Sequence, residues 1–532
     1  MEDVGGLVVD SAIRRKTMGR SRTARVLAGL GATVIRHLLD IADRFLLVPL
    51  FLANWGGVRY GEWLALAAGA GALAMLNLGM HTYVINRLRQ CYATGQIADF
   101  NSHLHSGLRL ALVSFTVGLL GVTVMAVLAP VGSWIGLKQT GRLTASVTIL
   151  LLAVNVLAQI PLGLVRGVYR SVAEYGREGM VGNAMILAQI VLTAAALVAK
   201  RGFAEVALAH LIPVWLGTAF AALDIRARHP EVVFGVRQGS WGLALRMLSP
   251  SLLFLLMSLA HALTSQGSVL VLSVWLGGAA VVLFSTTGLL ANAVMKLSSI
   301  AQGAVWPEFT ALQAENQLAK LRELHIGLVK VCLMATLSGA VAIYFAGPDL
   351  YRLWVRRQVD FDPLLMTLLL GYVTTASVWQ ASAVVAMSSN KHRVVVVRYV
   401  LAGVAAVGLC ILLVPVIGVY GAVIGLWGAD LLIRVFSIPN SICRLLDDRP
   451  LRFWWEAVLR GAPAVAVSAS LAVGVNELTR GSWLNLLLVP AIAMGGMGVT
   501  GFFTWLSGEE RARLVAVFRL VRLRSTASCE GR

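Results

Sequence analysis

The sequence predicts an all-α polytopic membrane protein with about fourteen transmembrane helices, arranged as two pseudo-symmetric six-helix lobes followed by two C-terminal helices. Composition is the first observation behind this prediction, since 58% of the 532 residues are hydrophobic and only 13% are charged. A soluble chain would carry about 25% charged residues, so the bilayer must solvate most of this one. The recurrence of apolar segments and an internal repeat are the other two observations.

The apolar segments divide the chain in order, and each has a length that a bilayer accepts. We interpret residues 1–25 as a disordered, basic cytoplasmic tail. The N-lobe, 26–225, takes six spans, near residues 26–52, 62–85, 104–129, 143–165, 180–199 and 204–223. The C-lobe, 226–445, takes six more, near residues 247–276, 279–305, 326–347, 363–388, 394–416 and 418–442. The region 446–506 holds two further spans, near 454–475 and 484–506, and 507–532 form a basic cytoplasmic tail.

An internal repeat relates the two predicted lobes. The string Leu104-His105-Ser106-Gly107-Leu108 returns in the second lobe as Leu324-His325-Ile326-Gly327-Leu328. A second pair of similar strings has nearly the same separation, namely Trp55-Gly56-Gly57-Val58 and Leu276-Gly277-Gly278-Ala279. Membrane proteins built from two similar halves usually move one half against the other around a central site. The repeat therefore favours a transporter.

The basic residues predict the orientation of the chain. With both termini placed in the cytoplasm, the cytoplasmic side carries roughly three times as many Lys and Arg residues as the outer side. Topology and attraction to anionic membrane lipids then account for most of the net charge of +19. We expect no binding of nucleic acid.

The first predicted span carries a cluster of ionisable residues. Its members are Arg36, His37, Asp40, Asp43 and Arg44. Arg36, Asp40 and Arg44 recur at every fourth position, so they share one face of the helix. A lone charge near the bilayer centre costs at least about 2.5 kcal/mol, so we expect this face to line a water-filled cavity or to face the other lobe. A ladder of structural salt bridges between helices is the alternative.

The second lobe supplies further candidates for a substrate-binding cavity. His261 lies near the middle of the seventh span, at the position that the repeat aligns with Asp40, and Gln266 lies just beyond it. Lys296 lies deep in the eighth span with no carboxylate one turn away. A buried lysine of this kind needs an anion, from the substrate or from another helix. Snorkelling of its ammonium toward the inner face is the alternative.

Asp430 and Arg434 lie one helical turn apart in the twelfth span. A structural ion pair is favoured for them, although Arg434 stays among the cavity candidates. Asp40, Asp43 and Asp430 are the carboxylates that we place deep in spans, so they are the candidates for ion pairing or for coupling to H⁺ or Na⁺. Basic residues near the span ends, Lys330 among them, are interpreted as interfacial anchors.

Nothing in the sequence indicates catalysis or a bound metal. The five cysteines show neither paired spacing nor metal-ligand clustering, and we find no phosphate-binding loop or serine-centred elbow. The predicted outward loops are short, which leaves little room for an active site. We therefore expect no enzyme, no catalytic residue, no metal and no cofactor. A membrane-embedded glycan polymerase or acyltransferase is the alternative from another class.

Five short stretches of the chain carry a family resemblance. They are Trp55-Gly56-Gly57-Val58-Arg59-Tyr60-Gly61-Glu62-Trp63 with Leu76-Asn77-Leu78-Gly79-Met80, Pro161-Leu162-Gly163-Leu164-Val165-Arg166-Gly167, Trp306-Pro307-Glu308-Phe309 and Met387-Ser388-Ser389-Asn390-Lys391. In this order and with this span count, the chain resembles Wzx-type polysaccharide flippases of the multidrug/oligosaccharidyl-lipid/polysaccharide (MOP) exporter superfamily. The resemblance covers roughly residues 26–445.

The resemblance implies a flippase that moves an undecaprenyl-pyrophosphate-linked oligosaccharide, an O-antigen or exopolysaccharide repeat unit, by alternating access. Transport would run from the cytoplasmic to the outer leaflet of the bacterial inner membrane, with polysaccharide polymerase and chain-length machinery as partners. Basic cavity residues attract the anionic headgroup in that family, a part that Arg36, Arg44, Lys296 and Arg434 could take here. Asp40 and Asp43 make the predicted cavity less positive than a cavity whose charged residues are all basic. A lipid II flippase or a cation-coupled drug exporter of the same superfamily is the alternative.

Overall fold

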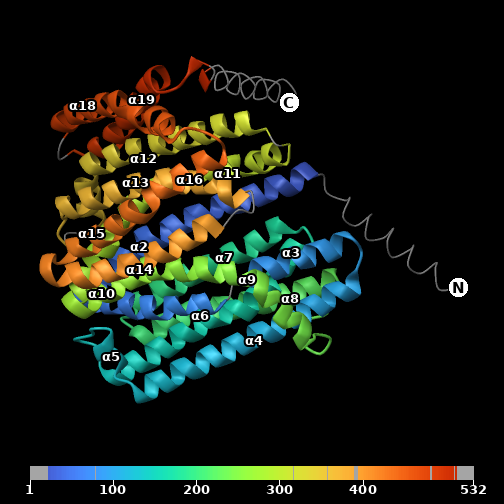
Figure 1. The fold of residues 1–532 in the computed structure, drawn as a ribbon. Helices are drawn as coiled ribbons and strands as arrows, with labels where there is room; N and C mark the ends of the chain where they lie inside the picture. The colour runs from blue at the N-terminus through green and yellow to red at the C-terminus, as the bar shows by residue number, and fades with distance from the viewer. Residues whose placement is uncertain are drawn as a thin grey trace, which may run out of the picture. The chain divides into compact units, whose positions relative to one another are not determined.

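The computed structural model describes residues 22–77, 80–315, 317–355, 358–388, 393–479, 482–508 and 510–511. All regular secondary structure within these ranges is helical, which confirms the predicted all-α class (Figure 1). The predicted tails fall largely outside the described residues, although helix α2 already begins at Arg22 and residues 507, 508, 510 and 511 belong to the structure.

Twelve helices in the described ranges are long and apolar enough to cross a membrane. They correspond one to one with the last twelve of the fourteen predicted spans. The first two predicted spans do not meet this criterion. They lie on the single long helix α2 (Arg22–Ala72), which is kinked at Gly56, and on η1 (Leu73–Asn77) and α3 (Met80–Ala93). Charges in the first span and the break after Ala72 in the second explain the difference, so these two spans stay predictions.

The chain forms two compact units, residues 1–282 and 283–532. The prediction placed the boundary after residue 225, whereas α9 and α10 contact α2, α3 and α4 and so belong to unit 1. After α3, unit 1 continues with α4 (Ile97–Leu128), α5 (Val131–Trp134), α6 (Arg142–Ser171), α7 (Tyr175–Val198), α8 (Phe203–Arg228), α9 (Trp241–Ala262), the π-helical η2 (Leu263–Gly267) and α10 (Ser268–Leu276). Helix α11 (Gly278–Ala314) begins in unit 1 and continues into unit 2.

The core of unit 1 lies where α3, α4 and α6 pack together, and α4 and α6 run side by side in Figure 1. Leu104 and Leu157 are fully buried there. Glycines allow close approach, since Gly107 lies against Val84 and Gly167 against Ile85. Small residues serve this purpose in membrane helices because apolar side chains gain little by leaving lipid.

Unit 2 is built around α12. It contains α12 (Leu318–Val355), α13 (Pro363–Ser388), α14 (Arg393–Ile417), α15 (Val419–Asp430), the π-helical η3 (Leu431–Val435), α16 (Ser437–Leu445), α17 (Pro450–Phe453), η4 (Trp454–Val458), η5 (Leu459–Gly461), α18 (Ala462–Thr479) and α19 (Asn485–Thr504). Cys332 of α12 and Val385 of α13 belong to its core. The last two helices pair with each other and pack on α12.

The internal repeat is visible in where the elements begin. Helices α4 and α12 start at residues 97 and 318, and α6 and α13 start at 142 and 363, so the two pairs have identical separations in sequence. Gly56 and Gly277 share this separation, and both adopt a positive φ, of 71° and 85°. An L side chain rarely adopts this backbone conformation. The two glycines therefore mark equivalent turns in the two halves of the chain.

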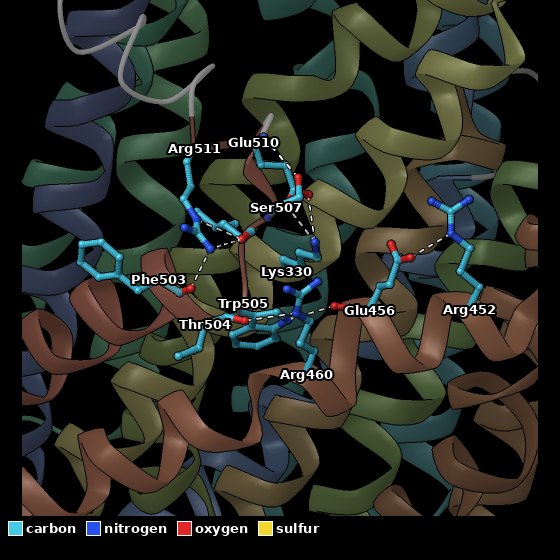
Figure 2. A network of polar contacts seen from close by, with 11 residues as sticks. Lys330, Arg452, Glu456, Arg460, Phe503, Thr504, Trp505, Ser507, Glu510 and Arg511 are labelled. Carbon is cyan, nitrogen blue, oxygen red and sulfur yellow. Dashed lines mark hydrogen bonds and ion pairs between the residues drawn. The ribbon is translucent and has the colours of Figure 1, made fainter.

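A buried ion pair joins the C-terminal segment to α12 in unit 2, as Figure 2 shows. The ammonium of Lys330, 2% exposed, donates to both carboxylate oxygens of Glu510 at 3.0 and 2.8 Å. The backbone N–H of Ser507 donates to the same carboxylate at 2.6 Å. The interpretation of Lys330 as an interfacial anchor is therefore wrong, because a lysine with a carboxylate partner does not need to reach the membrane surface.

The segment around Glu510 also closes the end of α19. The guanidinium of Arg511 donates to the carbonyl oxygens of Phe503 and Leu506 at 2.7 and 3.0 Å, which satisfies groups that a helix end leaves free. Trp505 is fully buried, and its indole N–H donates to the carbonyl of Glu456 at 3.2 Å. Trp505, Glu510 and Arg511 thus attach the end of α19 to the rest of unit 2.

Burial alone would raise the pKa of Glu510, but the hydrogen bonds from Lys330 and Ser507 outweigh burial and lower this pKa. A carboxylate with a lowered pKa stabilises the fold above its ordinary titration range. The contribution of Glu510 is therefore present at neutral pH and is lost as the pH falls through the folded-state pKa.

We expect Glu510→Gln to destabilise the protein more than Lys330→Met. The first substitution leaves a buried ammonium without a counter-ion, at a cost of roughly 3 kcal/mol. The second leaves a carboxylate whose side chain is 23% exposed and still accepts from Ser507. The midpoint of thermal unfolding of the purified protein in detergent measures both losses.

The double variant Lys330→Met/Glu510→Gln should recover most of the stability, because it leaves no unpaired charge. Lys320→Met, at an exposed position of the same helix, is the matched control and should change little. Equal losses for the two single variants would contradict the assignment.

Candidate functional site

The predicted site residues divide between the two units. Unit 1 holds Arg36, Asp40, Asp43, Arg44, His261 and Gln266, and unit 2 holds Lys296, Asp430 and Arg434.

The charged cluster of α2 lies on a part of the helix that the protein hardly covers. Arg36, His37 and Arg44 are exposed, and Asp40 and Asp43 are half-buried. The predicted i, i+4 pair forms between Arg36 Nε and Asp40 Oδ1 at 3.2 Å. Arg44 makes no ion pair with any residue that the structure describes. Within the described ranges the cluster therefore contains one pair on its own helix and no ladder to a neighbouring helix.

Helix α7 positions this part of α2 from one side. The side-chain amide of Asn183 donates to the carbonyl of Ala32 at 2.9 Å, and Gly179 lies directly against the Ala32 methyl group. Because a bulkier residue at 179 would displace α2, the contact fixes the helix one turn before Arg36. These contacts position the backbone of α2 beside the cluster, whose side chains at Arg36, His37 and Arg44 remain exposed.

His261 and Gln266 lie on either side of the junction between α9 and η2. His261, at the end of α9, is exposed. Gln266 belongs to the π-helical turn, and its amide group lies against Gly71 of α2, within 3.2 Å of where a Cβ atom would be. Gly71 therefore makes room for a polar side chain beside α2. π-helical turns inside α-helices frequently occur at functional sites.

Lys296 of α11 is half-buried in unit 2. Its ammonium makes neither a hydrogen bond nor an ion pair with the residues described for this unit, and only its backbone carbonyl is engaged, by Ser299 Oγ at 2.8 Å. The structure thus agrees with the sequence in giving Lys296 no nearby carboxylate on its own helix.

Asp430 and Arg434 form the buried pair that their spacing predicts. Arg434 Nη1 donates to Asp430 Oδ1 at 2.8 Å, and the side chains of Arg434 and Asp430 are 4% and 3% exposed. The indole N–H of Trp379 donates to Asp430 at 3.0 Å, and the guanidinium lies 4.7 Å from the ring centroid of Tyr399. The pair is enclosed within unit 2, and Arg434 Nε is its one buried polar atom without a hydrogen-bond partner among the residues described. This arrangement favours the structural role.

Sequence reasoning missed Glu62, which is fully buried at one end of unit 1. Its carboxylate accepts the backbone N–H groups of Lys138 and Gln139 at 2.5 and 2.7 Å and the hydroxyl of Thr140 at 2.5 Å. A buried carboxylate without these donors would be costly. An acidic residue within the motif Tyr60-Gly61-Glu62-Trp63 is a signal that the sequence contains, but the donors lie far along the chain.

Glycine contacts close the same end of unit 1. Gly61 of α2 and Gly278 of α11 touch through their backbones, and Gly136 lies against the carbonyl of Ser273 in α10. A Cβ atom on any of these three glycines would overlap its neighbour. These contacts bring together three connections, around residues 56, 138 and 277. The charge distribution predicts that all three lie on the outer side. We call the contacts of Glu62 and these glycines the closed end.

Two cavities occur elsewhere in the described structure. A groove of about 500 Å³ runs between α7 and α8, lined by residues such as Ala188 and Gly217. A smaller cavity of about 220 Å³ in unit 2 includes Asp349 and Arg352. Neither contains a predicted site residue.

No family model and no curated protein matches this sequence. Solved structures match the fold. An inward-facing multidrug-resistance MATE transporter of the MOP superfamily has a TM-score of 0.65 at 14% identity, covering 78% of this chain and 98% of the transporter. The lipid II flippase MurJ in an inward closed conformation has a TM-score of 0.64 at 10% identity, covering 89% of this chain and 98% of MurJ.

A third structure, the MATE multidrug transporter DinF-BH in complex with R6G, has a TM-score of 0.57 at 14% identity and covers 81% of this chain and 96% of the transporter. All three structures are described as transporters or a flippase. The chain therefore shares the fold of these MATE and MurJ structures.

We expect Gly61→Ala to destabilise the closed end, because the added methyl group would overlap the backbone of Gly278. Overpacking of this kind costs typically about 1–3 kcal/mol. Gly57→Ala is the matched control one turn earlier, where a Cβ atom would meet nothing within 4 Å. Thermal unfolding in detergent should show a lower midpoint for Gly61→Ala and an unchanged or slightly higher one for Gly57→Ala. Similar midpoints for both variants would mean that the glycine contact is not tight.

Proposed function

We propose that this protein is a flippase that moves an undecaprenyl-pyrophosphate-linked oligosaccharide from the cytoplasmic to the outer leaflet of the bacterial inner membrane. The main observation that supports this proposal is the charged cluster on α2. Five ionisable side chains lie close together on a helix of spanning length, and the protein leaves three of them exposed and two half-buried. Hydrocarbon cannot solvate them, so this face requires water.

A hydrated face in a membrane protein with this fold supports a transport path. The MATE transporters and MurJ share the fold, and their descriptions name multidrug transport and lipid II flipping. The match to MurJ extends over 89% of this chain and the match to the MATE structure over 78%. The wider match supports the flippase proposal over the drug exporter. A lipid II flippase is the second candidate, for the same reason.

Cations without an ion-pair partner among the described residues of their own unit support an anionic substrate. Arg44 and Lys296 form no ion pair with the residues described, whereas Arg434 already has a partner in Asp430. A fixed cation without a partner lowers the cost of carrying a pyrophosphate through a low-dielectric region. We therefore assign headgroup attraction to Arg44 and Lys296, with Arg36 in support, and remove Arg434 from the binding role.

The closed end of unit 1 supports alternating access. It lies at the end that the positive-inside rule places on the outer side, and it joins loops of both halves of the repeat. Opening of this end and closure of the other would expose the α2 cluster to each side in turn. Asp40 and Asp43 are the proposed carboxylates for coupling to H⁺ or Na⁺, since Asp430 is engaged by Trp379 and Arg434.

The test uses purified protein in liposomes that contain a fluorescent lipid-linked oligosaccharide in one leaflet. We expect Arg44→Ala and Lys296→Ala each to slow translocation by about tenfold, the loss of one charge-assisted interaction. Arg226→Ala and Lys320→Ala, at exposed positions of α8 and α12, are the matched controls. Normal translocation by both site variants, at normal abundance in the membrane, would overturn the assignment.

The same assay separates the remaining alternatives. A flippase leaves the mass of the lipid-linked sugar unchanged, whereas a polymerase or acyltransferase would increase it. Replacing the substrate with lipid II, or with a cationic dye, distinguishes the lipid II flippase and the drug exporter from the proposed function.

A further inference from the structure

Three connections of unit 1 are joined by contacts between their side chains, away from the closed end. They are the end of α3, the turn between α6 and α7, and the segment 229–240 that follows α8 and leads into α9. The charge distribution predicts all three to lie on the cytoplasmic side. A cluster of titratable side chains, which the proposed function does not use, connects them.

The segment 229–240 is fastened along α4, and we call it the strap. Asn101 exchanges hydrogen bonds with the backbone of Glu231 and Val233, both at 3.0 Å. His105 contacts the carbonyl of Val233 at 2.7 Å and accepts the N–H of Gln238 at 3.0 Å. The repeated motif around His105 thus holds the strap in place.

His229 begins the strap and lies between two carboxylates. It is 8% exposed. Its Nδ1 atom lies 3.3 Å from Glu231 Oε1 and 3.2 Å from the hydroxyl of Tyr92. Its Nε2 atom lies 3.5 Å from Glu174 Oε1, and neither Nε2 nor Glu174 Oε2 has a close hydrogen-bond partner among the residues described. The imidazole therefore faces one acceptor on each side.

The number of N–H groups on the His229 imidazole determines how many of the two carboxylates it can donate to. A neutral imidazole has one N–H, so it can donate to Glu174 or to Glu231 but not to both. An imidazolium has two, so it presents one N–H to Glu231 at 3.3 Å and the other to Glu174 at 3.5 Å, while the Tyr92 hydroxyl donates to Glu231. Each of these side chains then has a partner of the right kind. The neutral form donates to one carboxylate only, so the other keeps only its second partner, which is Arg228 for Glu174 and Tyr92 for Glu231.

We propose that His229 is a proton-binding site whose second proton fastens the strap to the α6–α7 turn. The imidazolium bridges Glu174 and Glu231, and loss of the proton releases one side of this bridge. Because the strap leads directly into α9, the first helix of the second repeat, the proton controls how firmly the start of that helix is held. The proposal is independent of what the protein transports.

The charged groups around His229 are consistent with this role. Arg228 Nη2 lies 3.3 Å from Glu174, and Arg177 is held by Asp224 at 2.7 Å, so Glu174 keeps capacity for a second cation. The imidazole of His229 beside it lowers the pKa of Glu174, and burial with the nearby Glu231 raises the pKa of Tyr92. The carboxylate therefore stays ionised and the phenol stays a donor at neutral pH.

Hydrogen–deuterium exchange of the full-length protein in nanodiscs tests the proposal. Protection factors of the Val232 and Val233 amides are compared at about pH 5.5 and about pH 8, which bracket the titration of histidine. We expect wild-type protection to fall by about tenfold at the higher pH, the loss of one charge-assisted hydrogen bond. The amide of Gln238 is not used, because it depends on His105.

Variants make the result specific to His229. His229→Gln should show low protection at both pH values, and His229→Lys, with a permanent charge, should show high protection at both. His103→Gln, which removes a histidine that contacts Arg87 on the same end of α4, should keep the wild-type response. Glu174→Gln should weaken the response, and it provides a readout if His229→Gln does not fold. A pH response that persists in His229→Gln, or its absence in the wild type, would overturn the proposal.

Discussion

The cost of placing charge in hydrocarbon governs the polar residues of this structure. A charge in a spanning helix must be paired, reach water or be neutralised. Asp430 pairs with Arg434 and Lys330 with Glu510, and of these four side chains only that of Glu510 is partly exposed. The residues of α2 are different, because only Arg36 and Asp40 pair among the described residues and the cluster stays largely uncovered. Charges of the same kind are therefore paired and buried in one place and left partly exposed in another.

Most of the fold could be predicted from the sequence because the bilayer imposes a length and a composition on each span. The last twelve predicted spans match helices of that kind in the described part of the chain. The first two do not, since the first carries the charges of α2 and the second is interrupted after Ala72. The division into two units was less predictable, because α9 and α10 pack on helices that lie far away in sequence.

The candidate site was predictable only where partners lie close in sequence. The one-turn spacing predicted both the Arg36–Asp40 and the Asp430–Arg434 pairs. Lys330 and Glu510 are 180 residues apart, and Glu62 binds a loop that no local pattern connects to it. The internal repeat predicted which positions correspond in the two halves, but it did not predict the contacts that their side chains make. His105 and His325 occupy equivalent positions, yet the first binds the strap and the second contacts Ser382 and stacks on Phe453.

The π-helical turn between α9 and α10 has a consequence for the direction of His261. A π turn accommodates one residue more than an α-helical turn, and each residue rotates an α-helix by about 100°. Deleting a single residue within Leu263–Gly267 would restore α-helical geometry and swing the imidazole by about that angle relative to α10. The direction of the His261 side chain therefore depends on the number of residues in the π-helical turn. A deletion of one residue there could change this direction in evolution without any amino-acid substitution.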